Sequence, residues 1–317
     1  KAALKVRGVV NVIEVPNLGK DGDRKLNSPG VAIVATNLWA AKKGRDALKI
    51  VWDKGSLAHE NNAWHRKELK AAIPRETTKV LDEKGDVDSA LEAAKKTFEN
   101  DYEVPFWGHF CMEPLSCSAQ VLKDKVIVKT SHQVPRRITP YVAKATGIPF
   151  ENIRLDNGRM GGGYGRRAGV DYLAEPIYLS QKMGRAVKVY WTREDDVRHG
   201  FINPAALYRV KAGVDENGSL IAFDTIGSET STPWVEGFPQ QTIPNSRIKR
   251  AFPVIKVPTG AWRGPGHNTI AFVYESMIDE IAVDLGRDPL KYRLDVLGEG
   301  KIYPFKEWIP VPGDKMI

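Results

Sequence analysis

The run Met160 to Arg167 holds four glycines within five positions and ends on two arginines. Because glycine has no side chain, the backbone here can approach a ligand closely. Several backbone N–H groups can then converge on one anion, particularly where a loop leads into a helix. Arg166 and Arg167 add two positive charges with planar donors. The run therefore predicts an anion-binding cradle.

Other glycine-rich loops match this run less well. A P-loop requires a lysine followed by serine or threonine, and no such pair follows Gly165. The dinucleotide-binding pattern is matched only as Gly163-x-Gly165-x-x-Ala168, with alanine in place of the third glycine. Its acidic residue is expected about 20 positions further on, and Glu194 lies later than that. NAD binding is therefore the disfavoured alternative. A turn in which two backbones simply pack closely is a second alternative.

The composition is that of an ordinary globular protein. A length of 317 residues accommodates one large domain or two, and 42% of the residues are hydrophobic. No apolar run approaches the ~18 residues of a membrane-spanning helix, and the N-terminus lacks the apolar core of a signal peptide. The net charge is +8, but lysines alternate with acidic residues, as in Leu81 to Asp88. We therefore expect no membrane span and no nucleic-acid partner.

Cysteine usage limits the metal chemistry. The chain has two cysteines, Cys111 and Cys117, and their spacing matches neither a zinc site nor an iron–sulfur ligand run. We expect two small buried hydrophobic side chains, with a disulfide between them as the alternative. This chain is not expected to hold an iron–sulfur cluster.

The first part of the chain alternates strand-like and helix-like patterns. The expected elements are strands at 9–15, 31–35 and 48–52, and a helix at 38–47 that is capped by Thr36 or Asn37. Residues 53–96 are charged and weakly periodic. The one helix expected there spans 87–95, with Asp86 as its N-cap. These patterns predict a small α/β unit followed by a connector.

The elements around the glycine run alternate at the spacing of β-α-β units. We expect strands at 126–130, 152–156 and 186–191, with helices at 135–146 and 169–183 between them. This order favours parallel strands joined by crossover helices. Ligands in such folds bind at the carboxyl ends of the strands, and the glycine run would lie there.

The last part of the chain predicts a hairpin and two helices. Strands at 207–214 and 219–228 flank the turn from Asp215 to Gly218. An apolar stripe predicts a helix at 270–283. A final helix begins after Asp288, with Pro289 in its first turn, and ends near Leu297.

Further motifs accompany the glycine run in a recognisable order: HFCMEPLSCSA at 109–119, TSHQ at 130–133, YWTREDD at 190–196 and GAWRGPGH at 260–267. With them, the chain resembles the molybdenum-binding large subunit of the xanthine oxidase family. The form GGGYGRR is most similar to the isoquinoline 1-oxidoreductase β-subunit and related aldehyde dehydrogenases. The resemblance implies an α/β (α+β) fold. It divides into a partial hammerhead α/β domain at 1–55, a connector at 56–96, and the N-terminal part of the molybdopterin-binding domain, with β-α-β units, at 97–317.

The resemblance also implies roles for individual residues. Catalytic positions would be Gln133, near an oxo ligand of molybdenum, Arg263, and Tyr164, which replaces the phenylalanine of many relatives. The implied cofactor-binding residues are Gly161, Gly162, Gly163, Tyr164, Gly165, Arg166, Gln133, Arg263 and Gly264. No residue is expected to ligate molybdenum, since the metal is held through the pterin dithiolene. Met112, Glu113 and Pro114 match a segment that lines the cofactor domain, where we expect packing rather than chemistry.

The family's reaction is hydroxylation of an aldehyde or N-heteroaromatic with oxygen from water. The implied cofactor is molybdopterin or molybdopterin cytosine dinucleotide with molybdenum. The implied partners are a small iron–sulfur subunit and a chain or segment carrying the C-terminal half with the glutamate base. The late match Gly298-Glu-Gly300 has the wrong order for that motif. The chain thus resembles the middle of a longer subunit, and alone it is expected to be inactive.

Two further interpretations stay open at the level of sequence. The first is a non-catalytic anion-binding or assembly protein of the same fold. The second is the NAD-type oxidoreductase that the glycine pattern permits. The family resemblance favours a periplasmic over a cytoplasmic location, while the sequence itself assigns neither. Substrate and electron acceptor are not specified by any motif.

Overall fold

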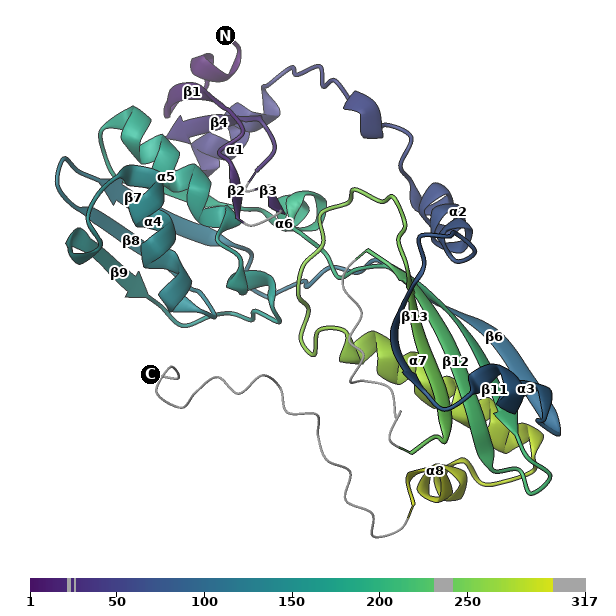
Figure 1. Cartoon of the computed structure of the whole chain (residues 1–317). Helices are drawn as coiled ribbons and strands as arrows, with labels where there is room; N and C mark the ends of the chain where they lie inside the picture. The colour runs from purple at the N-terminus through teal and green to yellow at the C-terminus, as the bar shows by residue number, and fades with distance from the viewer. Residues whose placement is uncertain (22–23, 26, 231–241, 299–317) are drawn as a thin grey trace. The chain divides into compact units, whose positions relative to one another are not determined.

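The computed structural model describes residues 1–21, 24–25, 27–230 and 242–298. They form a mixed α/β fold in two compact units, each assembled from separate stretches of the chain (Figure 1). Unit 1 comprises Lys1–Ala58, Gly108–Ile202 and Gly260–Trp262. Unit 2 comprises His59–Trp107, Asn203–Thr259 and the chain from Arg263 onward.

The N-terminal part of unit 1 is a two-stranded antiparallel sheet with one helix. Strands β1 (Val9–Val15) and β4 (Gly30–Ala35) pair, and α1 (Leu38–Asp46) packs against β4. The Asn37 side chain accepts a hydrogen bond from the Ala40 backbone N–H, which confirms one of the two predicted N-caps. Between the strands lie the short pair β2 (Lys20–Asp21) and β3 (Arg24–Lys25).

The strand expected at 48–52 was a wrong prediction. That segment has no strand partner within the described part of the chain. Its side chains are correspondingly exposed, with Val51 at 99% and Trp52 at 60%. A short apolar, β-branched run has the pattern of a buried strand, but a strand exists only where a neighbour supplies the ladder.

The main sheet of unit 1 has the strand order β10-β7-β8-β9. Its strands are β7 (Ser116–Val121), β8 (Val126–Thr130), β9 (Ile153–Asn157) and β10 (Val187–Tyr190). Helices α4 (Ile138–Thr146) and α5 (Asp171–Met183) cover one face (Figure 1). Buried apolar side chains of the sheet and both helices, such as Val128, Val142 and Leu173, form one core.

Only the first predicted crossover joins neighbouring strands. β8 and β9 are parallel and flank α4, as expected. After α5, however, the chain passes across the sheet, and β10 pairs antiparallel with β7. The sequence pattern did not reveal β7, whose buried Cys117 and Ala119 alternate with partly exposed residues. The glycine run follows β9 and precedes the 3-10 turn η5 (Arg166–Ala168), so it lies at the predicted strand end.

Unit 2 is a five-stranded sheet with helices on both faces. The strand order is β5-β13-β12-β11-β6. The strands are β5 (Lys79–Lys84), β6 (Lys96–Val104), β11 (Ala206–Val214), β12 (Leu220–Glu229) and β13 (Asn245–Ala251). Helix α7 (His267–Asp284) buries Val273 and Met277 against one face, and α8 (Pro289–Leu297) packs on α7. The predicted hairpin and both helices are confirmed.

The stretch expected to be a connector holds more structure than predicted. It contains α2 (Asn62–Ala72), β5 and α3 (Val87–Glu92), and both helices pack on the face of the sheet opposite α7. The Asp86 cap on α3 is confirmed. Helix α2 buries only His65, Leu69 and Ala72, and so few apolar positions gave no clear period. The division into hammerhead, connector and cofactor domains stays a prediction.

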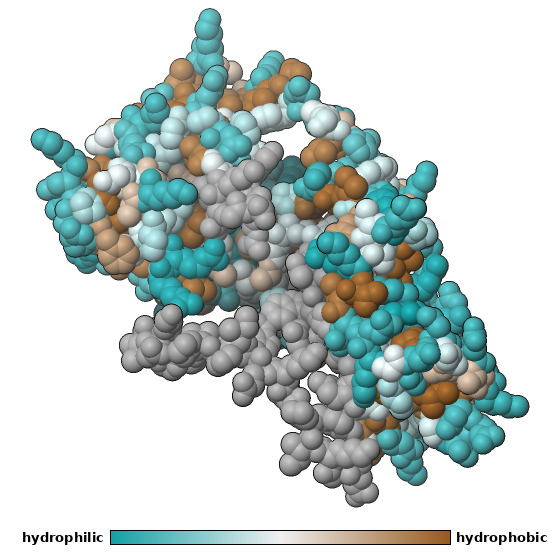
Figure 2. Space-filling view, viewed as in Figure 1, coloured by the Kyte–Doolittle hydropathy of each residue, from teal (hydrophilic) through white to brown (hydrophobic). Residues whose placement is uncertain are grey.

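Surface and cysteines agree with the composition. Hydrophilic side chains predominate on the face shown in Figure 2, with hydrophobic ones in separate patches. No helix among the described residues is long and apolar enough to cross a bilayer. Cys111 and Cys117 are buried free thiols rather than a disulfide. Burial raises the pKa of the Cys117 thiol to about 12, so it behaves as a small hydrophobic side chain.

Unit 2 also buries a carboxyl group, that of Glu229 at the end of β12. The residue is 5% exposed, and its Oε1 atom has no hydrogen-bond partner among the described residues. Burial raises the pKa of Glu229 to about 7, against the opposing effects of the Arg250 charge and the Tyr208 hydroxyl. The folded state therefore favours the neutral carboxyl.

Because the folded-state pKa of Glu229 lies above its ordinary value of 4.5, this group makes unfolding easier as the pH rises through the window from 4.5 to 7. Glu229→Gln should therefore increase the free energy of unfolding at pH 8, by roughly 2–3 kcal/mol, and change it little at pH 4. Denaturant unfolding at both pH values measures this difference. Glu216→Gln, in the exposed turn before β12, is the control. Equal effects of the Glu229 variant at both pH values would contradict the assignment.

Candidate functional site

The glycine run is a loop whose carbonyl groups bond to the chain itself. The carbonyl oxygen of Gly161 accepts from the Glu113 backbone N–H at 2.9 Å. That of Gly162 accepts from Arg167 Nε at 2.8 Å, and that of Gly163 from the Arg166 backbone N–H at 2.8 Å. By contrast, the N–H groups of Gly162 and Gly163 have no acceptor in the part of the chain that the structure describes. The loop thus presents donors and has its acceptors occupied.

Gln133 lies against this loop, just beyond the end of β8. Its Oε1 atom accepts from the Gly165 backbone N–H at 2.9 Å, and its own backbone N–H donates to the Arg167 carbonyl at 3.0 Å. The contact through Oε1 fixes the carboxamide orientation and leaves the Nε2 amino group as a donor at the loop. A Cβ atom at Gly163 would lie only 2.6 Å from Gln133 Oε1, so a side chain at this position would displace the carboxamide from the loop.

Two residues near the loop have strained backbones. Among the described residues, Phe110 (φ 46°) and Tyr164 (φ 52°) are the non-glycine residues with positive φ. Tyr164 is 40% exposed, so its ring is accessible at the surface of the loop. Strain of this kind is retained where the surroundings impose it, commonly at binding sites.

The structure assigns Arg166 a contact that the sequence did not reveal. Its side chain is buried and donates to both carboxylate oxygens of Asp171, at 3.0 and 2.6 Å. Its guanidinium lies 4.3 Å from the Phe201 ring centroid. The positive charge is therefore neutralised inside unit 1. A direct role of Arg166 in cofactor binding stays a prediction.

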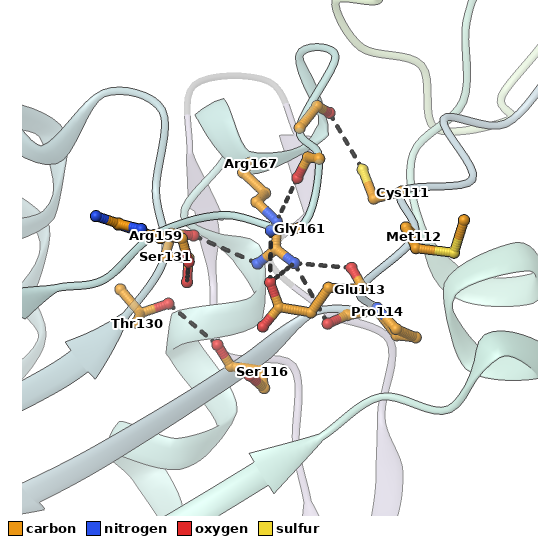
Figure 3. A network of polar contacts seen from close by, with 12 residues as sticks. Cys111, Met112, Glu113, Pro114, Ser116, Thr130, Ser131, Arg159, Gly161 and Arg167 are labelled. Carbon is orange, nitrogen blue, oxygen red and sulfur yellow. Dashed lines mark hydrogen bonds and ion pairs between the residues drawn. The ribbon is translucent and has the colours of Figure 1, made fainter.

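Arg167 is likewise buried rather than directed at a ligand. Besides Gly162, its guanidinium donates to the carbonyl oxygens of Glu113 at 2.8 Å, Pro114 at 3.4 Å and Ser131 at 3.4 Å. It also forms an ion pair with Glu113 Oε2 at 3.1 Å. Figure 3 shows this network, in which Arg167 joins two loops. The planar donors of Arg167, which the sequence places behind the loop, are thus used within the chain.

The segment Gly260–Trp262 lies against the glycine loop within unit 1. The Ala261 carbonyl accepts from His109 Nε2 at 2.8 Å, and the Ala261 backbone leaves no room for a side chain at Gly165. The next residues, Arg263 and Gly264, belong to unit 2. There the Gly264 carbonyl accepts from the Asn268 N–H at 3.2 Å, at the start of α7.

The structure therefore brings part of the predicted site together. Gln133 and the loop residues Gly161 to Arg166 lie together in unit 1, whereas Arg263 and Gly264 lie in the other unit. Glu299 and Gly300, of the late glycine match, lie outside the described residues. Among the residues described, no three histidine, cysteine or acidic side chains cluster as metal ligands would.

His109 is a site residue that the sequence did not single out. It is 7% exposed, and its ring packs edge-on against Phe201 with centroids 5.4 Å apart. Burial lowers the pKa of His109, which favours the neutral ring. Its Nε2 holds the Ala261 carbonyl, so His109 anchors the segment that precedes Arg263. The motif HFCMEP contains this residue, but only its contact with Ala261 reveals the role.

Comparison with known proteins identifies the family. The model of the molybdopterin cofactor-binding domain matches residues 72–231 and 242–297, which is more than half of the chain. The chain belongs to this family. The glycine loop, Gln133 and the main sheet all fall within the matched residues.

Individual relatives are oxidoreductase subunits. The chain is 25% identical to isoquinoline 1-oxidoreductase subunit beta of Brevundimonas diminuta, covering 92% of this chain and 40% of the relative. It is 26% identical to the aldehyde oxidoreductase molybdenum-binding subunit PaoC of Escherichia coli K12, covering 92% and 43%. The aldehyde oxidoreductase structure from Desulfovibrio gigas matches its fold with a TM-score of 0.67 at 20% identity, covering 92% and 37%. The chain thus spans less than half the length of these relatives.

Gly163→Val should remove the cofactor from the protein while leaving it soluble, because a β-branched side chain collides with Gln133 and blocks the loop surface. The measurement is molybdenum and pterin content of the purified protein. Gly30→Ala is the control, since its nearest contact would be the Ser28 carbonyl at 3.9 Å. Wild-type cofactor content in the valine variant would count against the cradle.

Proposed function

We propose that this chain is the molybdenum-cofactor-binding part of a molybdenum hydroxylase that oxidises an aldehyde or N-heteroaromatic with oxygen from water. The observation that carries the proposal is the pair of backbone N–H groups at Gly162 and Gly163, which have no acceptor among the described residues. They lie beside the Gln133 carboxamide at the end of a parallel strand pair. Family membership and the names of the relatives point to the same chemistry.

The donor set fits an oxygen-rich, anionic group. Backbone N–H groups and a carboxamide amino group donate to oxo and phosphate oxygens without adding an acceptor that would compete. The Glu113 carboxylate, which touches the loop at Gly161, is paired with Arg167. Residues 161–163 are also free of side chains that would keep such a group at a distance.

Residues of this chain would bind and orient the cofactor. When bound, the molybdenum cofactor supplies a metal-activated, water-derived nucleophile and accepts two electrons. The Gly162 and Gly163 N–H groups would hold its oxygen atoms, with Gln133 Nε2 as a third donor. The Tyr164 hydroxyl and the planar guanidinium of Arg263 are proposed as further donors on the basis of the family motif.

Other parts of the machinery would come from outside residues 1–317. We propose molybdopterin or its cytosine dinucleotide as the cofactor form, and a small iron–sulfur subunit as the partner through which electrons leave. The glutamate base would lie in the C-terminal half that the longer relatives have. General-base assistance contributes ~10²–10⁴-fold to such reactions, so this chain alone should not sustain turnover. The partial coverage of the relatives supports this division.

Metal and pterin analysis of the natively purified, full-length protein tests the proposal. We expect about one molybdenum and one pterin per subunit, since the site has a single cradle. The alternative, a non-catalytic anion-binding or assembly protein of this fold, predicts neither in a fully assembled complex. Absence of both from an assembled, iron-replete complex would overturn the proposed function.

Gln133→Ala should slow aldehyde oxidation about 10²-fold, the effect of removing one preorganised donor from a site where charge develops. Folding should change little, because Gln133 is exposed and the loop carbonyls keep their own partners. Steady-state rates per bound molybdenum, together with thermal unfolding, measure both effects. Gln120→Ala on β7 is the matched control. An unchanged rate per molybdenum would remove Gln133 from the site.

A further inference from the structure

We propose that Arg167 and Glu113 are positioning residues that turn the Gly162 and Gly163 N–H groups outward, and that Arg167 also neutralises the Glu113 carboxylate beside the loop. This role belongs to the cradle itself and rests on the proposed function. Neither side chain would touch the cofactor. Arg167 would act by donating to the Gly162 carbonyl on the inner side of the loop, and Glu113 by bonding to both backbone groups of Gly161.

Peptide-bond geometry sets the direction of the loop donors. In a planar trans peptide, the carbonyl of one residue and the N–H of the next point in opposite directions. The Gly162 carbonyl is directed at Arg167 Nε, at 2.8 Å, so the Gly163 N–H points away from Arg167. The Gly161 carbonyl is directed at the Glu113 backbone N–H, so the Gly162 N–H also points away from its anchor. The hydrogen bonds accepted by the Gly161 and Gly162 carbonyls therefore set the direction of the Gly162 and Gly163 N–H groups.

Arg167 reaches several segments of the chain at once. It lies in η5, directly after the loop, and its side chain is 0% exposed. From there it donates to carbonyls on three segments of the chain: Gly162 on the loop, Glu113 and Pro114 on the opposite segment, and Ser131 beyond β8. Buried carbonyls without donors are costly, so these contacts hold the loop in one conformation.

The carboxylate of Glu113 adds a negative charge beside the loop. Its Oε2 atom accepts from the Gly161 N–H at 2.9 Å, and its backbone N–H donates back to the Gly161 carbonyl at 2.9 Å. This two-bond clamp places the charge next to a proposed anion site. The ion pair with Arg167 Nη2 at 3.1 Å neutralises it. Loss of Arg167 would thus both release the Gly162 carbonyl and expose the anion to repulsion.

Arginine is required here because one planar group serves several acceptors at once. A lysine at 167 keeps the positive charge opposite Glu113, but its single ammonium cannot reach all the carbonyls that the fork reaches. Arg167→Lys should therefore keep the charge compensation of Glu113 but lose the hydrogen bonds that fix the loop geometry. Arg167→Met removes both, and Glu113→Gln keeps an acceptor for the Gly161 N–H while it removes the negative charge.

The experiment uses the natively purified, full-length protein with these three variants and Arg154→Lys, an exposed arginine on β9, as control. It measures molybdenum per subunit, kcat per bound molybdenum, KM, and amide hydrogen exchange of Gly161 and Glu113. For Arg167→Lys we expect kcat per molybdenum to fall at least about tenfold with little change in KM. Arg167→Met should also lose most of its molybdenum. Exchange at Gly161 should accelerate in both variants.

A purely structural role for Arg167 would lower yield and thermal stability but leave kcat per molybdenum and the Gly161 exchange rate at the values of the Arg154→Lys control. That result would overturn the inference. If Arg167→Met fails to fold, Arg167→Lys and Glu113→Gln decide. If the wild-type protein contains no molybdenum, the proposed function fails. Hydrogen exchange still decides the positioning claim, because unchanged exchange at Gly161 in Arg167→Lys would reject it.

Discussion

Hydrogen bonds from two arginines, the buried Arg167 and the partly exposed Arg193, to loop carbonyls are the interactions on which the rest of unit 1 depends. The consecutive carbonyls of Cys111 and Met112 accept from Arg193, and those of Glu113 and Pro114 accept from Arg167. This segment forms neither helix nor strand, so its carbonyls have no secondary-structure partners. Carbonyl groups that are removed from water need hydrogen-bond donors, and the arginines supply the donors that a sheet or helix would otherwise provide. The irregular backbone can then leave N–H groups available for a ligand.

The sheet places these loops beside one another. Since β8 and β9 are parallel, the loops that follow them emerge at the same edge, and Gln133 meets the glycine loop there. The second arginine, Arg193, comes from α6 (Arg193–His199), which begins in a capping box formed by Thr192 and Asp195. A bidentate ion pair from Arg45 to Asp195 ties α1 to this helix. Helices and turns thus fix the positions of the arginine side chains, and the hydrogen bonds of these side chains fix the conformations of the loops.

Local patterns predicted much of this arrangement, because they depend on neighbours in sequence. The glycine loop, β8, α4 and the Asn37 cap followed from spacing and turn chemistry. The arginine contacts did not, since the partners of Arg166 and Arg167 are set by the tertiary fold. The same applies to the pairing of β10 with β7, which local periodicity does not encode. The sequence shows that a residue is charged, but it does not show which distant residue neutralises that charge.

An experimental structure of the natively purified, full-length protein tests the central claim most directly, which is that the glycine loop binds a molybdenum cofactor through its backbone donors. The quantity to measure is the distance from the Gly162 and Gly163 backbone nitrogens to the nearest cofactor oxygen. The account predicts about 3 Å for at least one of them, the length of an N–H···O hydrogen bond, with the loop carbonyls still bonded to Arg167 and Glu113. A cofactor bound away from this loop, or a loop whose carbonyls face the cofactor, would contradict it.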